Sequence, residues 1–230
     1  MKIAVLGTGS VGQTIAGRLS GLGHEVMIGT RNVGESMART NRDAYGNPGF
    51  GDWLKSNPGV RPGTFAESVA FGEMVVNATL GSGAVSAIQS VDPRHLEGKI
   101  IIDVSNPLDF SRGLPPSLIP ELSNTNSLGE ELQKAFPKAH IVKTLNTMWC
   151  GLMVNPAMIG QGNHVNFISG NNEPAKARVK QLLNQFGWKN ENMIDLGDIR
   201  NARGQEAVLL LWLSLWQVKQ TGAFNYAIVS

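Results

Sequence analysis

Short runs of apolar residues recur along the chain and alternate with stretches whose periodicity suits helices. Six such runs predict strands near residues 2–6, 25–29, 60–64, 73–78, 99–104 and 139–144. Buried strands that alternate with helical connections are typical of a parallel sheet with crossover helices. The pattern therefore predicts an α/β protein built on a doubly wound parallel sheet.

The pattern changes after residue 150. It predicts a strand at 165–169, a helix at 173–186, a strand at 192–196 and a long helix at 202–219. We expect this part to form a small C-terminal α/β cap that ends in a long apolar helix. The predicted division is a larger domain at 1–150 and a smaller region at 151–230.

The first strand runs directly into a glycine-rich turn, and a helix-compatible stretch follows at 13–19. The turn consists of Gly7, Thr8, Gly9, Ser10, Val11 and Gly12. In a Gly-x-Gly-x-x-Gly turn the first glycine permits the tight turn, the second allows backbone to approach a diphosphate, and the third lets the helix pack closely on the sheet. An ordinary strand–turn–helix crossing is the alternative, but the flanking strand and helix supply the context that the motif requires. The sequence predicts a nucleotide diphosphate site on a Rossmann-type sheet, with the helix N-terminus facing the phosphates.

The residues after the second strand favour NADP(H). An NAD site usually carries an Asp or Glu there for the ribose 2′-hydroxyl, whereas this chain has Thr30, Arg31 and Asn32. A guanidinium makes charge-assisted bonds to a 2′-phosphate, which a carboxylate would repel. The alternative is that Arg31 lies on a solvated loop.

Small and amide-bearing residues follow three further strands. They are Ala78, Thr79 and Leu80, then Ser105, Asn106 and Pro107, and finally Asn146. An Asn side chain both donates and accepts, which suits recognition of a ribose and of a nicotinamide carboxamide. These residues are also common turn formers, but three such strand ends at one crevice favour binding.

Two long segments read as irregular. Residues 41–59 are predicted to form a loop with little structure of its own, near the adenosine end of the cofactor. Residues 107–126 follow the fifth strand, and ligands bind outside the carboxyl ends of strands, so we expect this segment to rim the pocket.

Composition limits the classes of partner. The 230 residues carry a net charge of +2 without a Lys/Arg run, so no nucleic-acid footprint is present. The single cysteine, Cys150, and an N-terminus that begins a core strand predict a cytoplasmic protein. The apolar stretch 207–216 is short of the ~20 residues that a membrane helix needs. We expect it to be buried or to face a second subunit, as in a homodimer.

No catalytic or metal-binding constellation is evident, so no catalytic side chain and no metal are assigned. The four histidines have no ligand spacing to one another or to Cys150. His164 is a distant acid/base candidate, with a satisfied position at the surface preferred. Asp103, inside an apolar strand, is expected to have a hydrogen-bonding role.

Together these segments resemble the NADPH-dependent reductases of the deazaflavin coenzyme F420, with the related oxidoreductase domain of the STEAP metalloreductases and, further off, pyrroline-5-carboxylate reductases. The matching segments are 1–12, 23–31, 103–107, 142–147 and 201–203 with the helix that follows. The resemblance implies that residues 8–12 hold the diphosphate, that Thr30 and Arg31 hold the 2′-phosphate, and that the segments around 78–80, 105–107 and 146 form the nicotinamide pocket. Some members have a further cation a few residues beyond Arg31; here Glu35 occupies that stretch and Arg39 is the nearest cation.

The resemblance implies an oxidoreductase that transfers a hydride between NADP(H) and coenzyme F420. Such a transfer needs two rings stacked within about 3–3.5 Å and no side-chain nucleophile. Two alternatives stay open: an NADPH-dependent reductase of a flavin, a ferric complex or a small imine, and a non-catalytic NADP(H)-sensing module. The expected partner is a small-molecule redox acceptor.

Overall fold

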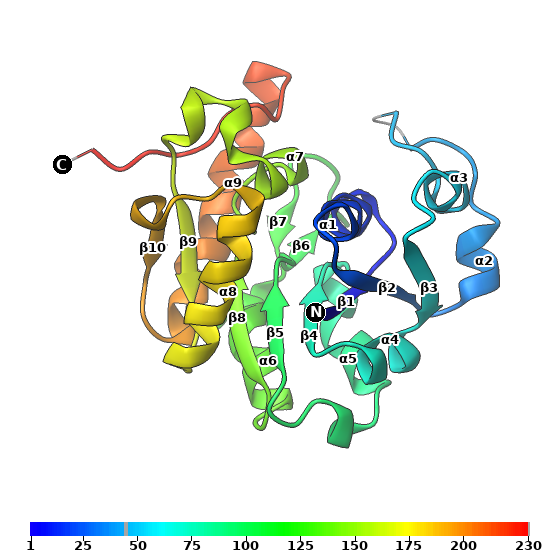
Figure 1. Ribbon diagram of the computed structural model, residues 1–230. Helices are drawn as coiled ribbons and strands as arrows, with labels where there is room; N and C mark the ends of the chain where they lie inside the picture. Colours follow the sequence, from blue (N-terminus) through cyan, green and yellow to red (C-terminus); the bar gives the residue numbers. More distant parts are fainter. Residues whose placement is uncertain (44–45, 230) are drawn as a thin grey trace.

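One sheet of eight strands forms the centre of the molecule (Figure 1). The computed structural model describes residues 1–43 and 46–229. The strands lie in the order β10-β9-β8-β5-β4-β1-β2-β3. Their bounds are β1 Lys2–Leu6, β2 Glu25–Thr30, β3 Val60–Thr64, β4 Met74–Asn77, β5 Ile100–Asp103, β8 His140–Thr144, β9 Asn166–Ser169 and β10 Met193–Asp195. All eight predicted strands are confirmed to within one residue at each end, and so is the doubly wound α/β class.

Helices cover both faces of this sheet. Their bounds are α1 Ser10–Gly21, α2 Val33–Met37, α3 Phe50–Lys55, α4 Phe65–Phe71, α5 Ala84–Gln89, α6 Leu128–Ala135, α7 Cys150–Val154, α8 Glu173–Phe186 and α9 Ala202–Lys219. Along β1, Ile3 and Val5 belong to the core under α1, α7 and α8, whereas Ala4 and Leu6 belong to the core under α4, α5 and α6. Because both faces are buried, the strands read as continuous apolar runs.

The C-terminal strands continue the same sheet, but one of them reverses direction. β9 pairs antiparallel with β8, while β10 pairs parallel with β9 through the crossover helix α8. The physical reason is the connection after β8: the chain forms α7 and short 3-10 turns before β9 without a crossover helix between the two strands. It therefore enters β9 from the carboxyl edge of β8. The parallel sheet predicted for the first six strands is confirmed, and the two strands of the predicted C-terminal cap extend it, with β9 antiparallel to β8.

The two segments predicted as irregular contain more structure than expected. Residues 50–55 form α3, whose Phe50 is buried and stacks on Trp53 at 6.0 Å between ring centroids. The prediction missed this helix because its few apolar positions lie inside a Gly- and Pro-rich stretch; residues 44 and 45 of that stretch lie outside the described residues. In the second segment, β6 Leu108–Asp109 pairs with β7 Ser117–Leu118 as a small antiparallel hairpin.

A buried cluster of charges joins the centre of the sheet to α9. The Lys143 ammonium donates to Asp103 Oδ2 at 2.8 Å and to the Ser105 carbonyl at 2.6 Å, and it lies 2.8 Å from Glu206 Oε1. All three charged side chains are almost fully buried. Burial opposes the charge on Lys143, but the two carboxylates outweigh it and raise its pKa.

Glu206 also caps the N-terminus of α6. Its carboxylate accepts from the backbone N–H groups of Leu128 at 2.9 Å and Gly129 at 3.1 Å, in the first turn of α6. Burial raises the pKa of Glu206, while Lys143 and these N–H groups favour the charged form. The sequence pointed to a hydrogen-bonding role for Asp103, and the ion pair with Lys143 gives it one.

We expect replacement of Lys143 by Met to lower the free energy of unfolding by about 3–5 kcal/mol, because two buried carboxylates lose their counter-ion. Urea denaturation measures the change. Lys138→Met is the matched control: Lys138 pairs with Glu97 at 2.7 Å with its side chain 72% exposed, and its loss should cost about 0–1 kcal/mol. Equal effects of the two substitutions would show that the buried cluster contributes no more than a surface pair.

Candidate cofactor site

A cleft of about 1140 Å³ lies at the carboxyl ends of β1, β2 and β4. This is large enough for a dinucleotide. Eleven of the predicted site residues line it: Gly7, Thr8, Gly9, Ser10, Val11, Thr30, Arg31, Asn32, Ala78, Thr79 and Leu80. The cleft lies where the strand order reverses between β1 and β4, which is the position expected for a ligand in a doubly wound sheet.

The three motif glycines occupy different environments. Gly7 has a φ of +109°, a conformation that favours glycine. A Cβ on Gly12 would lie 1.9 Å from the Gly7 carbonyl oxygen, so this glycine permits the helix to pack on the strand. A Cβ on Gly9 would meet no atom within 4 Å, so this position faces open space. Gly9 is the N-cap of α1 and no side chain caps the helix, so its first N–H groups suit a diphosphate.

Thr30 at the end of β2 and the two residues that follow it differ in whether their side chains already have hydrogen-bond partners. The Thr30 hydroxyl lies 2.7 Å from the Ser36 hydroxyl, and both are buried. Asn32 caps α2: its Oδ1 accepts from Glu35 N at 3.1 Å, and its Nδ2 donates to Glu35 Oε1 at 2.8 Å. Arg31 is exposed and lines the cleft.

Arg39 is a cleft residue that the strand-end pattern missed. Its Nη2 donates to Thr8 Oγ1 at 2.5 Å, and it lines both the cleft and a neighbouring cavity of about 210 Å³. Arg39 and Arg31 therefore place two cations in the cleft, with the Glu35 carboxylate lining the same wall. The only signal in the sequence was that Arg39 is the nearest cation beyond Arg31.

Four predicted residues do not line this cleft, namely Ser105, Asn106, Pro107 and Asn146. The Ser105 hydroxyl is buried and donates to Asp103 Oδ1 at 2.6 Å. Asn106 and Asn146 form two hydrogen bonds with each other. Asn106 Nδ2 donates to the backbone carbonyl of Asn146, and Asn146 Nδ2 donates to Asn106 Oδ1, each at 2.9 Å. This pair adjoins the cleft through Gly81, where a Cβ would lie 2.0 Å from the Asn106 carbonyl oxygen.

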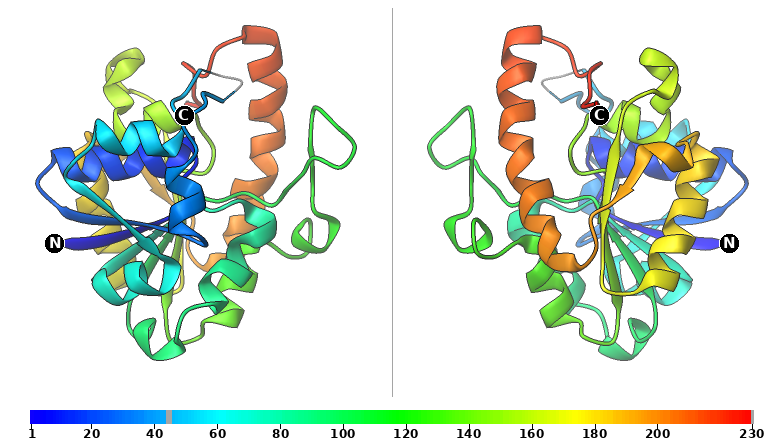
Figure 2. Two further views of the ribbon diagram at one scale, coloured as in Figure 1. Left: turned by 90° about the vertical axis from the view of Figure 1, so that its right-hand side faces the viewer. Right: turned by 90° about the vertical axis from the view of Figure 1, so that its left-hand side faces the viewer.

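Gly12 also does not line the cleft, since it is buried between α1 and the turn. The prediction that residues 107–126 rim the pocket is wrong for this cavity, because none of them lines it. The hairpin instead packs β7 against α9 and projects from that side of the molecule (Figure 2).

A chain of hydrogen bonds leads from the cleft to the buried charge cluster. Thr79 Oγ1 donates to Asn77 Oδ1 at 2.7 Å, and Asn77 Nδ2 donates to Asp103 Oδ1 at 2.8 Å. Asp103 in turn accepts from Lys143. The orientation of Thr79 at the cleft wall is therefore fixed by a network that extends to α9.

His164 does not serve the cleft. It is buried, with Nε2 2.8 Å from the Pro156 carbonyl oxygen and Nδ1 2.8 Å from Asn225 Nδ2. Both ring nitrogens are engaged, but in the interior, so the predicted surface position of His164 is wrong. Within residues 1–43 and 46–229, no group of His, Cys, Asp or Glu is arranged to hold a metal ion, and no helix is long and apolar enough to cross a membrane.

The cleft, its glycine turn and its cations define a Rossmann-type dinucleotide-binding protein, and comparison with known proteins identifies its family. Residues 2–107 match the family described as NADP oxidoreductase, coenzyme F420-dependent. A crystal structure of a protein assigned as an F420-dependent NADP reductase from Arthrobacter sp. FB24 is 48% identical, covers 100% of both chains and has a TM-score of 0.93. The chain belongs to this family, and it is an NADP-dependent oxidoreductase.

More distant relatives are longer proteins. Rat metalloreductase STEAP3 is 27% identical over 94% of this chain, which spans 38% of the rat protein's length. Human metalloreductase STEAP2 is 28% identical over 94% of the chain, which spans 37% of its length. A reductive aminase from Aspergillus terreus in complex with NADPH and ethyl levulinate shares the fold, with a TM-score of 0.64 and 16% identity over 95% of this chain and 62% of its own.

Two glycine substitutions should separate nucleotide binding from folding. In Gly9→Val the new side chain extends into open space, so the free energy of unfolding should stay within about 0.5 kcal/mol of that of the unsubstituted protein. The NADPH affinity should fall at least about tenfold. Gly12→Ala presses a methyl group on the Gly7 backbone and should cost about 1–3 kcal/mol of stability. Urea denaturation and calorimetric titration measure the two quantities. Equal losses of stability in both variants would contradict this assignment of roles.

Proposed function

We propose that this protein transfers a hydride between NADP(H) and the deazaflavin coenzyme F420. The observation that carries the proposal is a cleft at the glycine turn that is lined by two arginines beyond β2, in a chain 48% identical over its whole length to a protein assigned as an F420-dependent NADP reductase. Direct hydride transfer needs no side-chain nucleophile, because ring placement supplies most of the catalysis.

The cofactor's binding groups follow from the cleft. The α1 N-terminus and the turn at residues 7–12 receive the diphosphate. Arg31 and Arg39 receive the 2′-phosphate, since both line the cleft and a guanidinium binds phosphate oxygens through two N–H groups. The Glu35 carboxylate, held by Asn32, opposes them and leaves a net charge of about +1 in this part of the cleft.

The strand ends orient the reacting ring. Thr79 lines the cleft, and Asn106 and Asn146 lie beside it as a hydrogen-bonded pair. Asn146 Oδ1 is buried and has no hydrogen-bond partner among the described residues, so it is available to accept from a carboxamide N–H. When bound, the nicotinamide supplies from C4 the hydride that reaches C5 of the deazaflavin, and a proton from water completes the reduction.

Anaerobic stopped-flow mixing of the NADPH-loaded protein with F420, FMN, a ferric complex and a pyrroline carboxylate tests this function. We expect rapid loss of the F420 absorbance, with a primary isotope effect from NADPH deuterated at C4. Turnover of FMN, the ferric complex or the imine without turnover of F420 would identify a different reductase. NADPH binding without turnover of any acceptor would favour a sensing module.

Replacement of Arg31 by Asp should weaken NADPH binding by about one to two decades, because a charge-assisted bond to phosphate contributes roughly 1.5–3 kcal/mol. NADH binding should change little or improve, since a carboxylate can accept from the ribose 2′-hydroxyl. Calorimetric titration of both nucleotides measures the difference. Equal losses for NADPH and NADH would place Arg31 away from the 2′-phosphate.

We also propose that the chain forms a homodimer through the outer face of α9. Leu209 and Trp212 are buried against the body of the protein, but Leu211 is 53% exposed and Val218 is 83% exposed. Exposed apolar surface on a helix favours a protein partner. Light scattering at micromolar concentration should give twice the mass of the chain, and Leu211→Glu should give the monomer. A monomer mass for the unsubstituted protein would refute the dimer.

A further inference from the structure

Buried polar atoms without partners occur in α9, in the C-terminal segment Gly222–Tyr226, and in the loop after β8 that this segment contacts through Trp149. Within the described residues, five buried side-chain N or O atoms lack a hydrogen-bond partner. Four of them come from this region: Asn146 Oδ1, Thr147 Oγ1, Trp212 Nε1 and Asn225 Oδ1. Because about 90% or more of buried polar groups are paired, such a concentration indicates a place built to receive another polar group.

The segment lies over α9 and the edge of β9. Phe224 stacks on Trp212, with ring centroids 5.1 Å apart and an angle of 17° between the planes. The Tyr226 carbonyl accepts from Val165 N at 2.9 Å, and Asn225 Nδ2 donates to the Val165 carbonyl at 2.9 Å. Figure 1 shows the segment, in red, running from the end of α9 across the top of the C-terminal strands.

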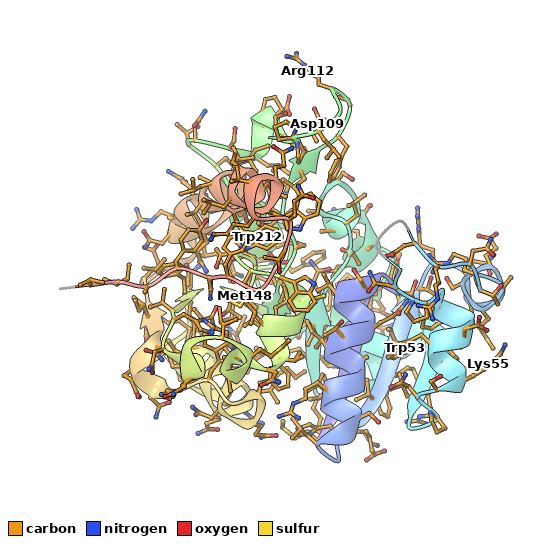
Figure 3. All side chains as sticks on the ribbon, turned by 90° about the horizontal axis from the view of Figure 1, so that it is seen from above. Trp53, Lys55, Asp109, Arg112, Met148 and Trp212 are labelled. Atoms are coloured by element: carbon orange, nitrogen blue, oxygen red, sulfur yellow. The ribbon has the colours of Figure 1, made fainter. Side chains whose placement is uncertain are left out.

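The segment also approaches the loop that follows β8. A Cβ on Gly222 would lie 2.6 Å from Trp149 Cγ, so only glycine allows this contact. Thr147 and Met148 precede Trp149 and are buried. In Figure 3, seen from above, Met148 and Trp212 are labelled near the middle of the molecule, whereas Asp109 and Arg112 project outward on the hairpin.

This region adjoins the cofactor cleft. Asn146 is bonded to Asn106, whose backbone contacts Gly81, and the neighbours of Gly81, Leu80 and Ser82, line the cleft. On its other side, Asn146 Nδ2 donates to the Gln205 carbonyl at 3.0 Å, which connects it to α9, the helix that also carries Trp212. The unpaired atoms therefore extend from the cleft's edge toward the C-terminal segment.

The unpaired atoms include both hydrogen-bond donors and hydrogen-bond acceptors. An indole N–H only donates, an amide oxygen only accepts, and a threonine hydroxyl does both. Asn146 Oδ1 is assigned above to the nicotinamide carboxamide, so a second ligand that pairs with the remaining atoms presents a carbonyl oxygen for Trp212 Nε1 and an N–H group for Thr147 Oγ1 or Asn225 Oδ1. The indole face of Trp212, on which Phe224 stacks, suits a flat partner once Phe224 is displaced. The chemistry that fits is a flat heteroaromatic ring that carries an amide, which describes both a nicotinamide and the pyrimidine ring of a flavin or deazaflavin.

We propose that the pyrimidine ring of the electron acceptor binds between the loop at residues 146–149 and α9, beneath Gly222–Tyr226, with Trp212 Nε1 donating to a ring carbonyl. This inference rests on the proposed reductase function and adds the acceptor's location and hydrogen-bonding groups. Trp212 is only 8% exposed and Phe224 covers it, so the C-terminal segment moves aside when the acceptor enters.

Trp212→Phe tests the proposal, because it removes the N–H group and keeps a ring to stack on Phe224. Fluorescence titrations with F420 and with FMN, in the presence of NADP⁺, measure binding without turnover. We expect the Kd of the acceptor that the unsubstituted protein binds to rise about tenfold, with NADPH affinity unchanged. Trp53→Phe makes the same substitution on α3 and should leave both affinities unchanged. Gly222→Ala, which pushes the segment off Trp149, is the second variant and should also weaken the acceptor alone.

A second set of titrations distinguishes binding of the nicotinamide ring from binding of the acceptor's ring. NADP⁺ and 2′-phospho-ADP-ribose, which lacks the nicotinamide, are titrated against the unsubstituted protein and Trp212→Phe. Equal affinities of the variant and the unsubstituted protein for both ligands support the acceptor. A loss confined to NADP⁺ would assign the site to the nicotinamide and overturn the proposal. Unchanged acceptor affinity in Trp212→Phe, or binding of neither F420 nor FMN, would also overturn it. Weaker FMN binding by Trp212→Phe, as expected, without reduction of F420 by the unsubstituted protein would contradict the proposed reaction. It would still support the proposed acceptor site.

Discussion

The ion pairs of Lys143 with the carboxylates of Asp103 and Glu206 hold together two parts of this molecule, the centre of the sheet and α9. They join β5 and β8 at the centre of the sheet to the first turn of α9, and through Glu206 to the N-terminus of α6. A buried charge is tolerated only when its hydrogen bonds are satisfied, and the Lys143 ammonium has an oxygen for each of its three protons. The position of α9 on the sheet follows from this requirement, and so does the course of the chain beyond it.

The same cluster explains how a cleft of mostly small residues keeps its shape. Thr79 is tied through Asn77 to Asp103, and Asn146 is tied to Asn106 and to the α9 backbone. Hydrogen-bonded networks of this kind fix side chains that would otherwise occupy several rotamers. Placement of a reacting ring by side chains is effective only if they are fixed in this way. The polar interior thus serves the cleft as well as the fold.

Local patterns in the sequence predicted most of the fold and the glycine turn. The strands were predictable because both faces of the sheet are buried and leave apolar runs, and Gly7 and Gly12 because their constraints act within six residues. Contacts between distant segments could not be predicted in the same way. Arg39 reaches Thr8 across 31 positions, and Glu206 reaches Lys143 across 63 positions. The direction of β9 depends on the length and shape of a connection, and α3 depends on Phe50 finding a core.

The contribution of Glu206 has a consequence for the way this fold can be rearranged in evolution. Residues 2–107 carry the matched family description, yet the lysine of β8 and the first turn of α6 both need a carboxylate from α9. A gene fusion that kept the nucleotide-binding strands and exchanged the end of the chain would leave a buried cation with one partner in place of two. Any replacement would have to supply a carboxylate at the same point of the sheet. The dinucleotide-binding strands of this protein therefore accept a new C-terminal segment without loss of a buried ion pair only when that segment supplies the same carboxylate.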